Sequence, residues 1–245
     1  MNDAIVSHIR TAAEWAYPNE ACGLVISIGK KPVAVSCRNL ARNARDQFVM
    51  CPEDYAQAAS QGQILAVWHT HVECDPVASE ADKIGCENTQ LPWYIVSAYM
   101  NDDGSYSFSD LNFIEPSGYE LDYVGRPYVW GVIDCFTILR DYYRKEFGIE
   151  INDYPREEPN GRTGHHYFID AFEKEGFVLL DSSASYEKGD LIFMQIQGVE
   201  PNHCAIYIGD DKILHHCVNR LSKVDIYGGY WEKHTTHRLR HKNHV

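Results

Sequence analysis

The segment 64–82 constrains the fold of this 245-residue chain more than any other. It begins as an apolar, strand-like run, and His69 and His71 follow at positions i and i+2, which share one face of a strand. After a loop of seven residues, Ser79 and Asp82 have the spacing of a helix N-cap pair. A strand, a short loop and a helix are therefore expected here, with two imidazoles and a carboxylate directed toward one point.

These side chains predict a metal site. Two imidazole nitrogens and one carboxylate oxygen, from His69, His71 and Asp82, leave the fourth position of a tetrahedral Zn²⁺ open, as in catalytic rather than structural zinc sites. A water molecule at such a position is activated. Each residue alone has a structural alternative, because a lone histidine is usually structural and Ser79 with Asp82 can simply cap a helix. The combination at this spacing favours the metal.

The composition indicates a globular chain of one or two domains, and we predict two. A net charge of −13 argues against sequence-independent binding to nucleic acid or to an anionic membrane. No apolar run approaches the ~18 residues of a membrane-spanning segment, and the N-terminus lacks signal-peptide features, so we expect folding in a cytoplasm. The eight cysteines include no CxxC pair, and we expect most to be reduced thiols.

The N-terminal half alternates helical and strand-like patterns, which predicts an α/β sandwich. Helices are expected over about 3–17, 53–61 and 80–88, and strands over 24–28, 64–69, 92–99 and 105–111. Glu20 lies at the entry of the first strand. The stretch 115–118, with both Pro and Gly, is the most linker-like and divides the chain into predicted domains 1–116 and 117–245. The expected fold class is α/β (α+β) in two domains.

Glu20, the two histidines, Ser79 and Asp82 together match the signature of JAMM/MPN metalloproteases without a gap or substitution. The N-terminal half therefore resembles that family, and the HExxH motif of zincins is absent. The resemblance implies that His69, His71 and Asp82 bind Zn²⁺. It further implies that Glu20 acts as general base and proton shuttle for the activated water, and that Ser79 stabilises the tetrahedral oxyanion.

Cys135 falls at the predicted N-terminus of a helix whose apolar residues lie on one side. The free N–H groups and the positive dipole end of a helix favour thiolate over thiol, as a nucleophilic cysteine requires. His203 begins the apolar strand 203–209, and His215 ends the next strand. This order is expected of papain-like thiol catalysis, whereas an inert buried cysteine is the structural alternative.

The motifs Pro-Tyr-x-Trp-Gly, Asp-Cys, Gly-Asp-Leu-Ile-Phe and His-x-Ala-Ile-Tyr-Ile-Gly resemble those of NlpC-type cell-wall cysteine peptidases. The resemblance implies a papain-like fold in which the helix carrying Cys135 packs on an antiparallel sheet. Cys135 would be the nucleophile and His203 the base that activates it. His215 would orient His203, and Tyr128 would add a hydroxyl near the oxyanion. The link from Tyr128 to Cys135 is shorter than family members usually have, and His216 would face the other side of its strand.

A JAMM domain joined to an NlpC-type domain in one short chain resembles the tail tip assembly proteins of lambda-like bacteriophages. This resemblance implies assembly in the host cytoplasm, a place at the virion tail tip and, beyond that, delivery to the host periplasm. Tail hub, tip and tape measure proteins would be partners, and peptidoglycan peptide stems would be the substrate of the thiol site. The N-terminal half would process or bind a tail component.

The first hypothesis is a bifunctional peptidase, with a thiol peptidoglycan endopeptidase and a zinc-dependent peptidase or isopeptidase. The alternative is a catalytically idle structural plug or assembly chaperone of the tail tip. A cellular deubiquitinase-like regulator is disfavoured by the fused cell-wall-type domain. The basic, His-rich run 233–244 is expected to be a solvated chain end.

Overall fold

The computed structural model describes residues 3–154, 167–196, 198 and 200–243, and only the backbone of 167–170. It divides into two compact units, Met1–Tyr119 and Glu120–Val245. The predicted α/β class in two domains is confirmed. The domain limit between residues 116 and 117 stays a prediction.

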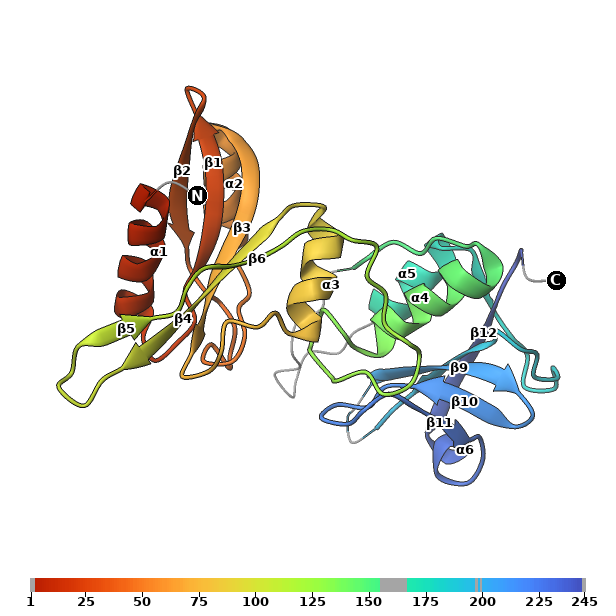
Figure 1. Cartoon of the computed structure of the whole chain (residues 1–245). Helices are drawn as coiled ribbons and strands as arrows, with labels where there is room; N and C mark the ends of the chain where they lie inside the picture. The colour runs from red at the N-terminus through yellow and green to blue at the C-terminus, as the bar shows by residue number, and fades with distance from the viewer. Residues whose placement is uncertain (1–2, 155–166, 197, 199, 244–245) are drawn as a thin grey trace. The chain divides into compact units, whose positions relative to one another are not determined.

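The first unit is an α/β sandwich built around one mixed sheet (Figure 1). Its helices are α1 (Asp3–Ala16), α2 (Pro52–Gln61) and α3 (Glu80–Thr89). Its strands are β1 (Cys22–Ile28), β2 (Lys31–Cys37), β3 (Gln63–Val72), β4 (Trp93–Met100), β5 (Tyr106–Phe108) and β6 (Asn112–Ile114). The strand order is β2-β1-β3-β4-β5, with β6 also beside β4, and only β3 and β4 run parallel among the described pairs.

The two faces of this sheet carry different helices. Ile5 and Ile9 of α1 pack with Val25 and Trp68 on one face. Residues of α2 and α3 pack on the other face, in a cluster that includes Val67 of β3. Because side chains alternate along a strand, the histidines two and four residues beyond Val67 lie on the α2 and α3 face.

The second unit contains an antiparallel sheet of six described strands, in the order β11-β10-β9-β8-β12-β7. The strands are β7 (Phe177–Leu179), β8 (Leu191–Met194), β9 (His203–Gly209), β10 (Lys212–His215), β11 (Lys223–Ile226) and β12 (Thr235–His241). The described helices are α4 (Cys135–Phe147), α5 (Tyr167–Lys174) and α6 (Tyr230–His234).

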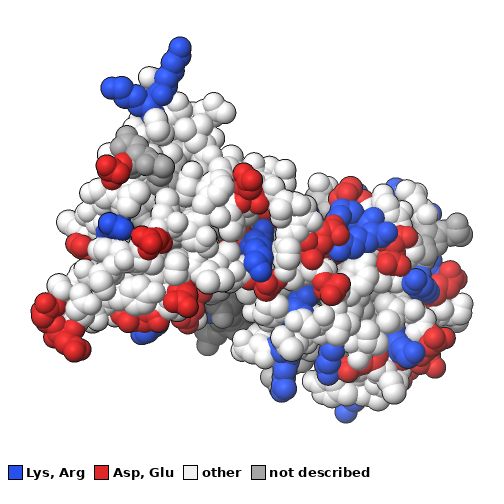
Figure 2. All heavy atoms as spheres, viewed as in Figure 1, with Lys and Arg blue, Asp and Glu red and all other residues white. Residues whose placement is uncertain are grey.

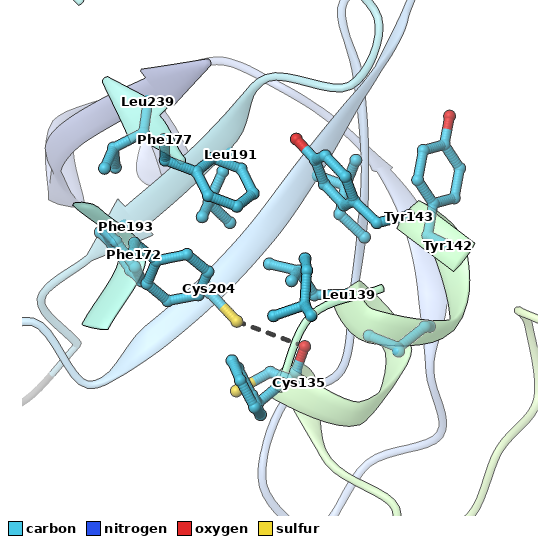
Figure 3. Packing of buried hydrophobic residues seen from close by; sticks show 14 of the residues in the cluster. Cys135, Leu139, Tyr142, Tyr143, Phe172, Phe177, Leu191, Phe193, Cys204 and Leu239 are labelled. Atoms are coloured by element: carbon cyan, nitrogen blue, oxygen red, sulfur yellow. Dashed lines mark hydrogen bonds between the residues drawn. The ribbon is translucent and has the colours of Figure 1, made fainter. Parts of the chain in front are cut away.

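A large apolar cluster fixes α4 on this sheet (Figure 3). Leu139 and Tyr143 of α4 meet Leu191 and Phe193 of β8 within it. The Cys204 thiol of β9 donates a hydrogen bond to the Cys135 carbonyl oxygen across 3.2 Å, drawn as the dashed line in Figure 3. The helix that begins with Cys135 is thus tied to the strand that begins with His203.

Two sequence-based expectations about elements are wrong. The run 105–111 is not one strand: only β5 (Tyr106–Phe108) lies within it, and the next strand, β6, begins at Asn112 and pairs with the opposite end of β4. The run 233–244 is not a solvated end: β12 lies between β8 and β7, and Leu239 and His241 are buried. Its Arg240 binds the buried Asp190 carboxylate, with Nε 2.7 Å from Oδ1. His244, at the end of that run, lies outside the described residues.

On the face of the molecule shown in Figure 2, Lys and Arg alternate with Asp and Glu and do not gather into one basic patch. Among the described helices, none has the length and apolar character needed to cross a membrane.

Candidate active sites

The first site brings together the three predicted metal ligands. His69 Nε2 lies 3.1 Å from His71 Nε2 and 3.1 Å from Asp82 Oδ1, and His71 Nε2 lies 3.4 Å from Asp82 Oδ2. The histidines come from the last residues of β3 and the aspartate from the first turn of α3. All three side chains are largely buried. Hydrogen bonds from both histidines hold the pKa of Asp82 far below its usual range, although burial alone would raise it.

The Nε2 atoms of both histidines face the cluster. His71 Nδ1 lies 3.1 Å from the Asp75 carbonyl oxygen, which can only accept, so Nδ1 carries a hydrogen. When a metal ion replaces the hydrogen that Nε2 shares with Asp82, the Nε2 lone pair points into the cluster. The His69 ring is held by Phe48, stacked at 4.8 Å between centroids, and by the edge of Trp93 at 5.6 Å. Its Nδ1 is buried with no hydrogen-bond partner among the described residues.

These distances fit a zinc ion. Ligand atoms on a tetrahedral Zn²⁺ with bonds of about 2.0–2.1 Å lie about 3.3 Å apart. The three observed separations of 3.1, 3.1 and 3.4 Å bracket that value. The donor set of two imidazole nitrogens and one carboxylate oxygen is also one that zinc accepts with an open fourth position.

Glu20 is placed beside this cluster by strand pairing. Cys22 pairs with His69 in the β1–β3 register, and Ala21 N donates to Thr70 Oγ1 across 2.8 Å. The Glu20 side chain is 5 % exposed, and its burial raises its pKa to about 8. The charges of His71 and Asp82 both affect that pKa, so the carboxyl lies within electrostatic reach of the metal ligands.

Ser79 is the N-cap of α3 and forms a capping box with Asp82. Its Oγ accepts a hydrogen bond from Asp82 N at 3.1 Å, while Ser79 N donates to Asp82 Oδ2 at 2.7 Å. The structural and functional interpretations of this pair therefore coexist. Ser79 is exposed, and a side-chain hydrogen bond from it also contributes to the lowered pKa of Asp82, so its role at an oxyanion stays a prediction.

The second site begins with Cys135, the first residue of α4. The buried Asp134 side chain caps this helix by accepting from Phe136 N and Thr137 N at 3.0 and 2.9 Å. A hydrogen bond with the Cys204 thiol, together with the hydrogen bond and charge of His203, holds the pKa of Cys135 well below its usual range despite its burial. The thiolate form is thus favoured.

A chain of hydrogen bonds sets which nitrogen of each histidine carries hydrogen. His215 Nε2 donates to Asp225 Oδ2 across 3.1 Å, because a carboxylate can only accept. His215 Nδ1 is then the acceptor for His203 Nε2, 3.1 Å away. His203 Nδ1 is left for the Cys135 thiol proton, which is the tautomer that a general base requires. Against the effect of burial, hydrogen bonds to the Cys135 and Cys217 sulfurs raise the pKa of His203 to about 9.

The Cys217 thiol also contacts both histidines. Its Sγ is 3.6 Å from His215 Nδ1 and 3.9 Å from His203 Nε2. Burial opposes ionisation of this thiol, but hydrogen bonds with both histidines lower its pKa to about 6. The Trp231 ring covers His215 edge-on, with centroids 4.5 Å apart.

The predicted residue Tyr128 packs against two aromatic rings other than those of His203 and His215. Its ring contacts Trp130 at 5.8 Å and His216 at 4.9 Å between centroids. His216 Nε2 faces the Arg220 carbonyl at 3.0 Å, apart from the hydrogen bonds of His215. The role of Tyr128 at the oxyanion stays a prediction.

Comparisons with known proteins give a family match in each of the two units. Residues 2–109 match prokaryotic homologs of the JAB domain, and residues 125–240 match the NlpC/P60 family. Tail tip assembly protein K of Escherichia phage N15 is 36 % identical over 243 residues, which cover 98 % of this chain and 94 % of that protein. Tail tip assembly protein K of Escherichia phage lambda is 34 % identical over 193 residues, covering 79 % and 89 %. The NlpC/P60 domain of the peptidoglycan hydrolase SagA, a solved structure, is 23 % identical over 48 % of this chain and 89 % of that one, with a TM-score of 0.31, too low to carry an argument.

The two family matches define a chain that joins a JAB-type domain to an NlpC/P60 domain. The chain belongs to the family of phage tail tip assembly proteins K. The family resemblance inferred from the sequence motifs is thereby confirmed.

Three residues at the second site were not foreseen from the sequence. Asp134, directly before Cys135, is a residue type typical of helix N-caps, and the sequence could have indicated this role. Cys217 follows His215 by two residues, the spacing that puts side chains on one face of an extended chain. Asp225 offered no local signal, because its contact with His215 depends on the pairing of β10 with β11.

Proposed function

We propose that the C-terminal unit is a thiol endopeptidase that cuts the peptide stems of peptidoglycan. The observation that carries this proposal is the hydrogen-bonded chain of Asp225, His215 and His203, which ends at a cysteine on a helix N-terminus. The match to the NlpC/P60 family supports the reaction class. The family of the chain supports action at a phage tail tip.

In the proposed reaction, the Cys135 thiolate attacks the carbonyl carbon of the scissile amide. His203 donates its proton to the leaving amine, and a thioester to Cys135 remains. His203 then takes a proton from water as that water attacks the thioester, which releases the carboxylic acid and restores the thiolate of Cys135 with protonated His203. His215 and Asp225 keep His203 in the required tautomer throughout.

The test is hydrolysis of muropeptides by the purified full-length chain. Cys135→Ala should reduce the rate more than about a thousandfold, since it removes the nucleophile. Cys74→Ala is the matched control, because it makes the same chemical change at an exposed cysteine of the first unit. Equal rates for wild type and Cys135→Ala would refute the thiol mechanism.

For the N-terminal unit we propose a zinc-dependent peptidase or isopeptidase. His69, His71 and Asp82 would hold the ion, which when bound supplies a Lewis acid and an activated water. Glu20, buried one strand away from the ligands, would take and return a proton. Ser79 would donate its hydroxyl hydrogen to the oxyanion.

This metal assignment is tested by elemental analysis of the purified chain. The double substitution His69→Ala with His71→Ala should remove one equivalent of tightly bound zinc relative to wild type. His237→Ala, at a half-buried position of β12 in the second unit, serves as the control for loss of a histidine. Zinc content that is the same in the double variant and in wild type would exclude these residues as ligands.

We propose further that the chain assembles in the host cytoplasm and is carried at the virion tail tip to the host periplasm. Tail hub, tip and tape measure proteins are the proposed partners. Infectivity of phage carrying Cys135→Ala or Glu20→Gln separates an enzyme from a catalytically idle plug or assembly chaperone. Full infectivity of both variants would favour the idle role.

A further inference from the structure

Three potential metal-ligating atoms converge beside the proposed general base. They are His203 Nε2, His215 Nδ1 and Cys217 Sγ, which all lie within 4.8 Å of one another. Their separations are 3.1 Å between the nitrogens, 3.6 Å from sulfur to His215 Nδ1 and 3.9 Å from sulfur to His203 Nε2. Two such groups occur among the described residues, and this one contains sulfur whereas the group in the first unit does not.

The triangle has the dimensions of a zinc site. Bonds of about 2.0–2.1 Å to nitrogen and about 2.3 Å to sulfur at tetrahedral angles separate two nitrogens by about 3.3 Å and a nitrogen from sulfur by about 3.6 Å. The observed separations differ from those values by no more than about 0.4 Å, so small side-chain movements would complete the site. Two imidazoles and a thiolate are also a donor set that zinc prefers to harder cations.

The neighbouring groups prepare the ligands for a cation. Asp225 accepts a hydrogen bond from His215 Nε2, which directs the Nδ1 lone pair into the triangle, as carboxylates do behind many histidine ligands of metals. His203 and His215 are buried, whereas Cys217 is half-buried, so the cluster is open to solvent on the sulfur side. Water or a substrate group could occupy the fourth position there.

We propose that His203, His215 and Cys217 bind a zinc ion that switches off the thiol site. The switching consequence rests on the function proposed above for Cys135, whereas the binding does not. Coordination through Nε2 uses the lone pair of that nitrogen, and the remaining hydrogen of the neutral His203 ring is then on Nδ1. The nitrogen that faces Cys135 is a donor in this state and cannot accept a proton from a thiol or from water. The base is thus blocked without a bond between metal and nucleophile.

The binding is tested with Co²⁺ as a probe on the full-length chain, freed of metal and kept reduced. Coordination by a thiolate produces a near-ultraviolet charge-transfer band, which the sulfur-free site of the first unit cannot give. We expect this band in wild type, its loss in Cys217→Ser, and its disappearance from wild type when Zn²⁺ displaces the cobalt. The band should persist in the control Cys74→Ser and also in Cys135→Ala.

The proposal is overturned if folded wild type gives no such band, or if Cys217→Ser keeps it while circular dichroism matches wild type. Loss of the band in Cys135→Ala but not in Cys217→Ser would place the metal on the nucleophile instead, which also refutes the site. Should Cys217→Ser fail to fold, Cys217→Ala provides the same comparison. None of these outcomes depends on hydrolysis, so failure of the proposed function is distinguishable from failure of the metal site.

The switch itself is tested by muropeptide hydrolysis at increasing free Zn²⁺, with each protein compared with its own zinc-free rate. Stoichiometric zinc should inhibit wild type, and Cys217→Ser should need at least about tenfold more zinc for the same inhibition, since it lacks one ligand. The variant His69→Ala with His71→Ala should keep the wild-type response, because it alters only the first site. Equal zinc sensitivity of Cys217→Ser and wild type would refute the switch.

Discussion

Asp134 is predicted to hold the start of α4, and with it the position of Cys135. Its Oδ1 accepts from Phe136 N, from Thr137 N and from the Thr137 hydroxyl, and its Oδ2 accepts from Gly131 N across 3.0 Å. The side chain is 2 % exposed, so water cannot readily replace it. Asp134→Ala would therefore remove the acceptor of all four hydrogen bonds, whereas Asp134→Asn keeps one oxygen for the helix cap.

The magnitudes of these two changes differ. Loss of an N-cap costs about 1–2 kcal/mol, and loss of the part-buried hydrogen bond from Gly131 N adds about 1–2 kcal/mol. For Asp134→Ala we expect a total near 3 kcal/mol, which corresponds to about a hundredfold in the local opening equilibrium. For Asp134→Asn, which loses mainly the Gly131 contact, we expect about 1–2 kcal/mol.

Hydrogen exchange followed by mass spectrometry on peptides covering 135–147 measures this local opening directly. Asp181→Ala serves as the control, because Asp181 accepts from Ser183 N in an exposed turn of the same unit. Exchange in α4 should accelerate strongly in Asp134→Ala, moderately in Asp134→Asn and hardly in the control. If Asp134→Ala changed the exchange of α4 less than tenfold, the capping argument would be refuted.

Three further predictions concern catalysis and packing. The pKa of Cys135 is lowered and that of His203 is raised to about 9, so the thiolate–imidazolium pair persists up to about pH 9. The kcat/KM for muropeptides should therefore fall as the pH rises through about 9. A pH profile that stays flat above about pH 9 would contradict this assignment. Asp225→Ala removes the acceptor that sets the histidine tautomers, so kcat should fall about tenfold with little change in KM. Asp225→Asn should restore part of the lost kcat. An unchanged kcat in Asp225→Ala would argue against the hydrogen-bond chain. Gly23→Ala would place a Cβ 2.1 Å from the Val35 carbonyl oxygen. We expect the free energy of unfolding of the first unit, measured with urea, to fall by about 1–3 kcal/mol. An unchanged urea midpoint would show that β1 and β2 can move apart at no cost.

Local signals in the sequence account for most of the first site. The spacing of His69, His71 and Asp82 already specifies a strand end, a loop and a helix start, and the structure has β3 and α3 in that order. The pairing of Cys22 with His69, which places Glu20, required β1 to lie beside β3 and was visible only through the family motif. A motif match thus supplied a long-range contact that periodicity cannot.

The second site shows where such reasoning ends. The helix start at Cys135 and the strands at His203 and His215 follow from local patterns, and the structure joins the two histidines at 3.1 Å. Asp225 reaches His215 only because β10 and β11 pair His215 with Lys223, which puts the residue two positions further on the same face. That register depends on the geometry of the intervening turn, which no residue pattern in it specifies. The same register orients the His215 lone pair toward Cys217, so one strand pairing underlies both the proposed base and the proposed zinc switch.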